Sequence, residues 1–133
     1  MRVRPLFALV LLVAAACGAP DDDVKVTLEH SRFALDRTEF RPGETVTFVI
    51  VNDDPIDHEF ILGDEEVQDV HESGTGHHHG EVPGEISVPA GETRTATFTF
   101  PVALGGSDGT LIVGCHLPGH YAYGMRAEVR VTG

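Results

Sequence analysis

Short runs of alternating apolar and polar residues constrain the fold of this chain more than any other feature of its sequence. Successive side chains of a β-strand point to opposite faces, so an alternation with a period of two predicts a half-buried strand. Four runs alternate clearly, over residues 24–29, 45–50, 95–100 and 126–131. Turns rich in Gly, Pro and Asp separate these runs, and none of them is long enough to form an amphipathic helix.

Weaker runs near residues 33–40, 58–62, 85–88 and 110–115 raise the total to about eight strands. A chain of 133 residues has room for one domain, and this number and spacing of strands is typical of two packed sheets. We therefore predict an all-β domain over residues 24–133, folded as a Greek-key β-sandwich. The sequence contains no long amphipathic helix and no internal repeat.

The first sixteen residues have the layout of an export signal. Two Arg residues precede an apolar run over residues 6–16, which is too short to span a bilayer. Three Ala residues then precede Cys17, as at a lipoprotein cleavage site. We expect a signal peptide over residues 1–16, a lipidated Cys17 in a polar tether over 17–23, and an exported protein anchored on the extracytoplasmic face of a membrane, in the periplasm or at the cell surface. The alternative is ordinary cleavage that leaves Cys17 as a free thiol.

The second cysteine, Cys115, stands in a segment whose residues favour a metal site. Cys115, His120 and Met125 follow one another at five-residue intervals, and the Gly and Pro residues between them can fold the three side chains together. This mixture favours copper, because a blue-copper site combines two His and one Cys with a weak axial Met. Zinc sites rarely use Met, and a catalytic Cys–His pair does not need a thioether on the same loop. The alternative is a structural Cys in the core.

Strand parity indicates where the fourth ligand comes from. Cys115 and Met125 each share a strand face with alternate apolar residues, so both sulfur atoms are expected to point into the same end of the interior. His58 shares its face with Phe60 and would point inward from a separate strand. We therefore predict one type 1 copper held by His58, Cys115, His120 and Met125. A lone His on an apolar face can also be an ordinary core residue, which is the alternative for His58.

Residues 115–125 resemble the copper loop of the cupredoxins, the relatives of plastocyanin, azurin and pseudoazurin. Residues 43–48 and 89–93 resemble strand openings of the same fold, and the similarity covers roughly residues 24–132. The resemblance implies a cupredoxin-like sandwich and one-electron transfer. It implies imidazole ligation by His58 and His120, thiolate ligation by Cys115 and a long axial bond to Met125.

Two departures from the commonest cupredoxin pattern bear on function. Glu59 follows His58 where many electron-transfer cupredoxins carry Asn, and the His58-Glu59-Phe60 sequence resembles a subgroup associated with copper tolerance. The loop spacing also resembles the last domain of multicopper oxidases, but Gly114 replaces one of their His residues and the ligand count excludes an oxidase. We expect an electron carrier and not an enzyme. The alternative is a copper-tolerance protein that sequesters or delivers copper.

An acidic, His-rich insertion occupies about residues 63–84. It predicts a short helical turn over residues 65–71 and a possible secondary metal site or copper-capture loop, formed by His71, His77, His78 and His79. His116, next to Cys115, is expected either on an electron exit route or facing solvent.

The charge of the chain restricts its partners. The formal charge is −12, and loss of the two Arg residues of the leader makes it −14. Such a field excludes nucleic acid and anionic lipid as docking surfaces, which leaves membrane contact through the lipid anchor only. It can steer a redox partner with a basic docking surface, maintain solubility, or reflect adaptation to high salt. We expect the protein to be a monomer.

Overall fold

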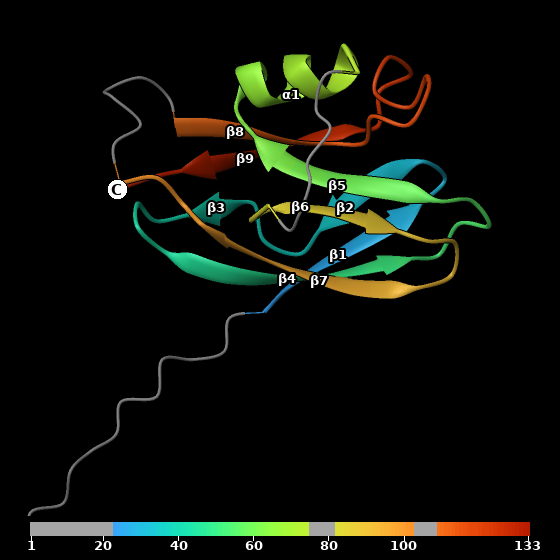
Figure 1. Cartoon of the computed structure of the whole chain (residues 1–133). Helices are drawn as coiled ribbons and strands as arrows, with labels where there is room; N and C mark the ends of the chain where they lie inside the picture. The colour runs from blue at the N-terminus through green and yellow to red at the C-terminus, as the bar shows by residue number, and fades with distance from the viewer. Residues whose placement is uncertain (1–22, 75–81, 103–108) are drawn as a thin grey trace, which may run out of the picture.

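Two β-sheets pack face to face in the computed structural model, which describes residues 23–74, 82–102 and 109–133 (Figure 1). The first sheet has the order β2 (Arg32–Leu35), β1 (Val24–Glu29), β4 (Thr45–Asn52) and β7 (Thr93–Thr99). The second has the order β3 (Glu39–Phe40), β9 (Arg126–Val131), β8 (Gly109–Gly114), β5 (His58–Gly63) and β6 (Glu85–Val88). This arrangement confirms the predicted all-β sandwich.

The order of the strands requires the chain to cross between the sheets more than once. β1 lies parallel to β4, β3 lies parallel to β9, and the other pairs are antiparallel. The predicted run over residues 33–40 is in fact two strands in different sheets. The chain leaves the first sheet after Asp36, which exchanges hydrogen bonds with Lys25, and joins the second at Thr38, whose carbonyl accepts from the Arg130 N–H at 2.8 Å.

The core lies between the sheets and is centred on four buried Phe side chains. Phe40 stacks on Phe100 with ring centroids 4.2 Å apart, and Phe48 contacts Phe60 at 5.2 Å. Phe48 belongs to the first sheet and Phe40 and Phe60 to the second, so these contacts join the two layers. Burial of each ring contributes about 1.5–3 kcal/mol. The alternating residues of the sequence supply the rest of the core, as their period predicted.

A single short helix, α1 (Glu65–Glu72), covers the outer face of the second sheet within the described residues (Figure 1). It begins at Asp64, whose carboxylate accepts from the Val67 N–H at 3.0 Å. Two acidic residues in its first turn and His71 in its last turn complement the helix dipole. The helical turn expected over residues 65–71 is therefore a complete helix of 8 residues. No described helix is long and apolar enough to cross a membrane.

The helix is held to the sheet by a polar residue, Gln68, which is buried. Its amide nitrogen donates to the carbonyl oxygens of Ile61 at 3.2 Å and Ile112 at 2.9 Å, on β5 and β8. Its amide oxygen lies 2.7 Å from His116 Nε2. Gly114 makes this approach possible, because a Cβ there would overlap the Gln68 amide and lie 2.8 Å from the Tyr121 ring. The hydrogen bonds of Gln68 therefore dock the helix together with the packing of Val67 over Gly63.

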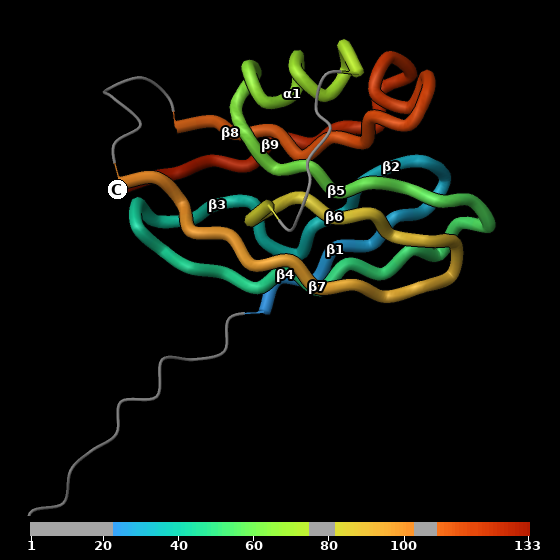
Figure 2. Tube along the Cα trace, in the orientation of Figure 1, coloured from blue at the N-terminus to red at the C-terminus, as the bar shows by residue number. Residues whose placement is uncertain are grey.

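Three connections that lie near the candidate ligands gather toward one end of the sandwich. Figure 2 shows the β1–β2 turn, the β4–β5 connection and the loop between β8 and β9 at that end. Hydrogen bonds from the β1–β2 turn to Asp54 join the first two of these segments. Three connections distant in sequence therefore meet where the sheets end.

We predict that Gln68→Leu lowers the free energy of unfolding by about 2 kcal/mol or more, because a side chain of similar size leaves two carbonyl groups and a buried imidazole without this partner. Urea denaturation of the purified protein would measure the change. Glu66→Leu, on the exposed side of the same helix, is the matched control and should change stability by less than about 0.5 kcal/mol. Equal effects of the two substitutions would show that Gln68 does not anchor the helix.

Candidate metal centre

Three candidate ligand atoms from two segments of the chain converge on one point. His58 Nδ1 lies 3.3 Å from His120 Nδ1, and Cys115 Sγ lies 3.9 Å from His58 Nδ1 and 3.2 Å from His120 Nδ1. The point equidistant from these atoms is about 2 Å from each, which is close to the bond lengths of first-row metals to nitrogen and sulfur. In the described part of the chain this is the one group of three or more His, Cys, Asp or Glu residues that could hold a metal ion.

The loop between β8 and β9 brings Cys115, His120 and Met125 together by backbone hydrogen bonds. The Cys115 N–H donates to the Met125 carbonyl at 3.2 Å, and the Met125 N–H donates to the His120 carbonyl at 3.0 Å. Gly119 and Gly124 lie in the left-handed region at φ +86° and +97°, which allows the two tight turns between the ligands. Met125 is buried beside Cys115 at the start of β9, as strand parity predicted.

The sulfur of Cys115 is buried and receives a hydrogen bond from the backbone. The Glu59 N–H donates to Cys115 Sγ at 3.3 Å. Burial raises the pKa of the Cys115 thiol, more than hydrogen bonds from the Glu59 and Leu117 N–H groups lower it. A bound cation would favour the thiolate in this setting, because metal binding requires the deprotonated sulfur. The thiol, the two imidazoles and Met125 are therefore a donor set that fits copper.

Glu59 also connects the first ligand strand to the loop. Its carboxylate accepts a hydrogen bond from the His116 N–H at 3.2 Å. Glu59 therefore contacts the loop with both its backbone N–H and its side chain. It contacts the Cys115 sulfur and the backbone of the residue that follows it.

His58 is held from behind by Asp54, a residue that the sequence analysis missed. His58 Nε2 lies 2.8 Å from Asp54 Oδ2, and the His58 side chain is 0% exposed. Burial raises the pKa of Asp54, but hydrogen bonds from the Ser31 N–H, His58 and the His30 N–H outweigh it and hold the pKa below its ordinary value. An acidic residue four positions before the first ligand His was the signal that could have indicated this contact.

His116 is buried under helix α1, so the hypothesis that it faces solvent is wrong. Its side chain is 2% exposed, and its Nδ1 and Nε2 lie 2.9 Å from Glu72 Oε2 and 2.7 Å from Gln68 Oε1. Its ring stacks on Tyr121 with centroids 4.5 Å apart. His116 therefore connects the ligand loop to the helix.

The proposed secondary metal site stays a prediction. Only His71 of its four residues lies in the described part of the chain, and its Nε2 is 3.3 Å from Glu85 Oε1. His77, His78 and His79 lie outside the described residues, as do the signal peptide and Cys17.

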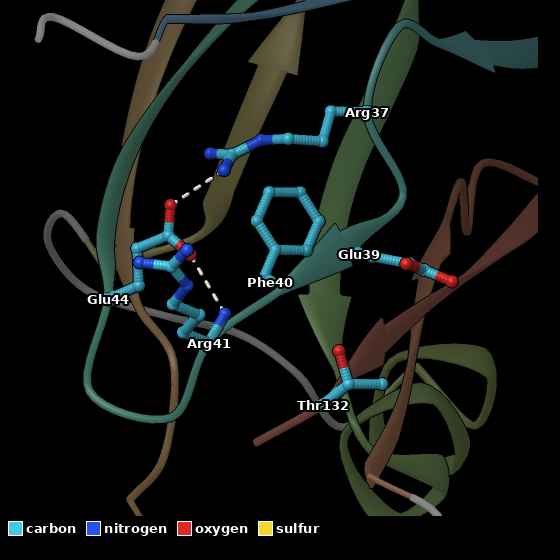
Figure 3. Close-up of a pocket in the computed structure, with 6 residues that line it drawn as sticks. All are labelled: Arg37, Glu39, Phe40, Arg41, Glu44 and Thr132. Carbon is cyan, nitrogen blue, oxygen red and sulfur yellow. Dashed lines mark hydrogen bonds and ion pairs between the residues drawn. The ribbon is translucent and has the colours of Figure 1, made fainter.

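A hollow of roughly 330 Å³ beside β3 lies at the other end of β9 from the ligands, since Met125 precedes this strand and Thr132 follows it (Figure 3). Arg37 lies over the Phe40 ring at 4.5 Å and pairs with Glu44 at 2.7 Å. A hydrogen bond from the Arg41 N–H lowers the pKa of Glu44 more than burial raises it. Arg37 and Glu44 pair with each other in this hollow, which contains none of the four candidate ligands.

Comparisons with known proteins agree with this donor set. The family model described as copper binding proteins of the plastocyanin/azurin family matches residues 21–132. A relative named copper-resistant cuproprotein CopI from Rubrivivax gelatinosus is 31% identical over 125 residues, covering 86% of this chain and 72% of the relative. The CopI protein of Vibrio cholerae is 31% identical over 113 residues, covering 83% of this chain, which spans only 60% of that relative.

Solved structures of blue-copper proteins share the fold. Auracyanin B is 22% identical with a TM-score of 0.64, covering 84% of this chain and 88% of that one. Auracyanin A from Chloroflexus aurantiacus, described as a "blue" copper protein, is 25% identical with a TM-score of 0.59, covering 83% and 98%. The cofactor is copper, and His58, Cys115, His120 and Met125 form a type 1 copper-like site. This chain belongs to the plastocyanin/azurin family of copper binding proteins.

Proposed function

We propose that the protein is a one-electron carrier that works outside the cytoplasm. The observation that carries this proposal is the support of the ligands by the surrounding protein. His58 is bonded to Asp54, and Cys115 receives the Glu59 N–H. Bound copper supplies a one-electron couple, and ligands held in this way have little freedom to rearrange when the charge of the site changes. The export and lipid anchor predicted from the leader complete the proposal.

The second imidazole, that of His120, offers electrons a short route between the metal site and the surface. His120 is partly exposed, whereas His58 and Cys115 are buried. A hollow of about 240 Å³ is lined by His120, Tyr123 and the β1–β2 turn, and the Tyr123 side chain is 91% exposed. A partner on this face would approach the site through the His120 ring.

The acidic surface supports a partner with a basic docking surface. Helix α1 exposes Glu65, Glu66 and Asp69, and it contacts the ligand loop through His116. A net charge of −12 raises the encounter rate with a cationic protein at low salt. We propose docking of the monomer beside the ligand loop.

A second candidate function is copper tolerance by sequestration or delivery of copper. The relatives named copper-resistant cuproproteins support it, and so does the predicted His-rich insertion. In this case the type 1 site would store or hand on copper, and the insertion would capture it.

We expect Cu(II) to give the wild-type protein an intense visible absorption band and Cys115→Ser to lack it, because the band arises from the thiolate–copper bond. Visible spectra of the two proteins with one equivalent of Cu(II) would test this. Tyr123→Phe, beside the site but not a ligand, is the control and should keep the band. A Cys115→Ser protein that is still coloured would refute the assignment of the thiolate.

We expect Met125→Leu to bind copper and to have a higher reduction potential than the wild type. Leu has a similar volume and cannot donate the electron pair by which the axial thioether favours Cu(II). Voltammetry of the copper-loaded proteins measures the potential. Complete loss of copper would instead show that Met125 is needed to assemble the site.

Deletion of His77–His79 should leave the visible band and electron exchange unchanged and remove at most a loosely bound copper or zinc. A Gly-rich segment loses about 1–2 kcal/mol of backbone entropy for each residue that binding fixes, which disfavours a tight site. Calorimetric titration of both proteins and copper-tolerance assays in a copper-sensitive bacterial host provide the measurements. A tight second site that disappears with the deletion, together with lost tolerance, would favour sequestration over electron transfer.

A further inference from the structure

The two-residue turn between β1 and β2 has an unusual backbone conformation for its sequence. Glu29 pairs with Arg32, so the turn consists of His30 and Ser31 alone. Both have left-handed backbones, with φ of 53° and 54°. Turns of this kind strongly prefer Asn and Gly, because other residues with a positive φ have crowded backbones. A contact elsewhere has to stabilise the conformation.

That contact is the carboxylate of Asp54. The His30 N–H donates to Asp54 Oδ1 at 2.7 Å, and the Ser31 N–H donates to Asp54 Oδ2 at 2.8 Å. The left-handed conformation of the turn therefore coincides with two N–H groups bonded to one buried carboxylate. Each carboxylate oxygen of Asp54 therefore accepts a backbone hydrogen bond, and Oδ2 also contacts His58.

The backbone of Asp54 is also held in place, by the side chain of Asn52 at the end of β4. The Asp54 N–H donates to the side-chain oxygen of Asn52 at 3.0 Å. The Asn52 amide nitrogen lies 2.8 Å from the Ile56 carbonyl and 3.0 Å from the Val88 carbonyl, and Asn52 is buried. Asp54 is therefore held by two segments of the first sheet and has a defined position relative to β5.

From this position Asp54 determines which nitrogen of His58 carries the proton. Asp54 Oδ2 lies 2.8 Å from His58 Nε2, and an ionised carboxylate can only accept a hydrogen bond. The proton of a neutral His58 ring is therefore on Nε2, and the lone pair of Nδ1 faces Cys115 and His120. A carboxylate behind a metal-ligating imidazole also raises the basicity of the ligand.

We propose that Asp54 is a positioning residue of the copper centre, which fixes the Nε2-protonated tautomer of His58 and increases the preference of the site for Cu(II) over Cu(I). The left-handed β1–β2 turn is the support that holds the Asp54 carboxylate. The inference rests on the copper assignment and is independent of whether the protein carries electrons or confers tolerance.

Asp54→Asn is the decisive variant, because an amide has one oxygen and cannot accept all the donors that meet at the carboxylate. We expect Cu(II) affinity to fall tenfold or more relative to Cu(I), which corresponds to a rise of about 59 mV in the reduction potential of a one-electron couple. Voltammetry of the copper-loaded full chain measures the potential. Asp53→Asn is the matched control, because it removes the same charge from the adjacent, exposed residue and should leave the potential nearly unchanged.

A second readout does not depend on copper. Nitrogen-15 NMR of the histidine rings in the metal-free protein should find the His58 proton on Nε2 in the wild type and in Asp53→Asn. It should find a changed tautomer population in Asp54→Asn. His30→Gly, which keeps the N–H and relieves the crowded backbone, should preserve the wild-type tautomer and the wild-type potential.

Three results would overturn the proposal. They are a wild-type His58 without a proton on Nε2, an unchanged potential and tautomer in Asp54→Asn, and an equal rise in potential in Asp53→Asn. The wild-type NMR result decides the tautomer even if Asp54→Asn does not fold. Failure of the wild type to give a visible band with Cu(II) would refute the copper assignment and leave the tautomer measurement standing.

Discussion

Two imidazole nitrogens and a sulfur lie within 3.9 Å of one another at one end of this protein, and the domain has to hold these three ligand atoms together. Much of the structure around them fixes their positions. Asp54 holds His58 from behind, Glu59 holds the loop that carries Cys115, and His116 secures the same loop to helix α1. Binding of a cation would join the segments that carry these atoms, so part of the binding free energy would stabilise the fold.

These supports come from both sheets, which is why the sandwich is necessary to the site. The stacked Phe side chains fix one sheet relative to the other. The first sheet contributes the Asp54 anchor through β1 and β4, and the second contributes the ligands through β5, β8 and β9. A shift of one sheet against the other would move Asp54 relative to His58. The geometry of the copper centre is therefore a property of the whole domain.

Much of the fold and the donor set was predictable from the sequence. The alternation of apolar residues, and the strand face on which each side chain lies, depend only on residues that are close together in the chain. Alternation identified the strands, and side chains two residues apart share a face, which placed Cys115 and Met125 at the same end. The rest depended on contacts between distant residues. The run near residues 33–40 divides because its halves pair with different partners, β1 and β9. In the sequence, Asp54 and Gln68 are indistinguishable from ordinary polar residues. Their partners are N–H and carbonyl groups of distant residues, which the neighbouring sequence does not indicate.

The absence of a side chain at Gly114 determines what can pack on the outer face of the second sheet. Any β-carbon at that position overlaps the amide of Gln68 and the ring of Tyr121, so a larger residue would displace the helix from the sheet. The outer face of this sheet therefore accommodates the helix only while position 114 is a glycine. A substitution at Gly114 would therefore disturb α1 together with His116 and Tyr121, which pack beside the ligand loop.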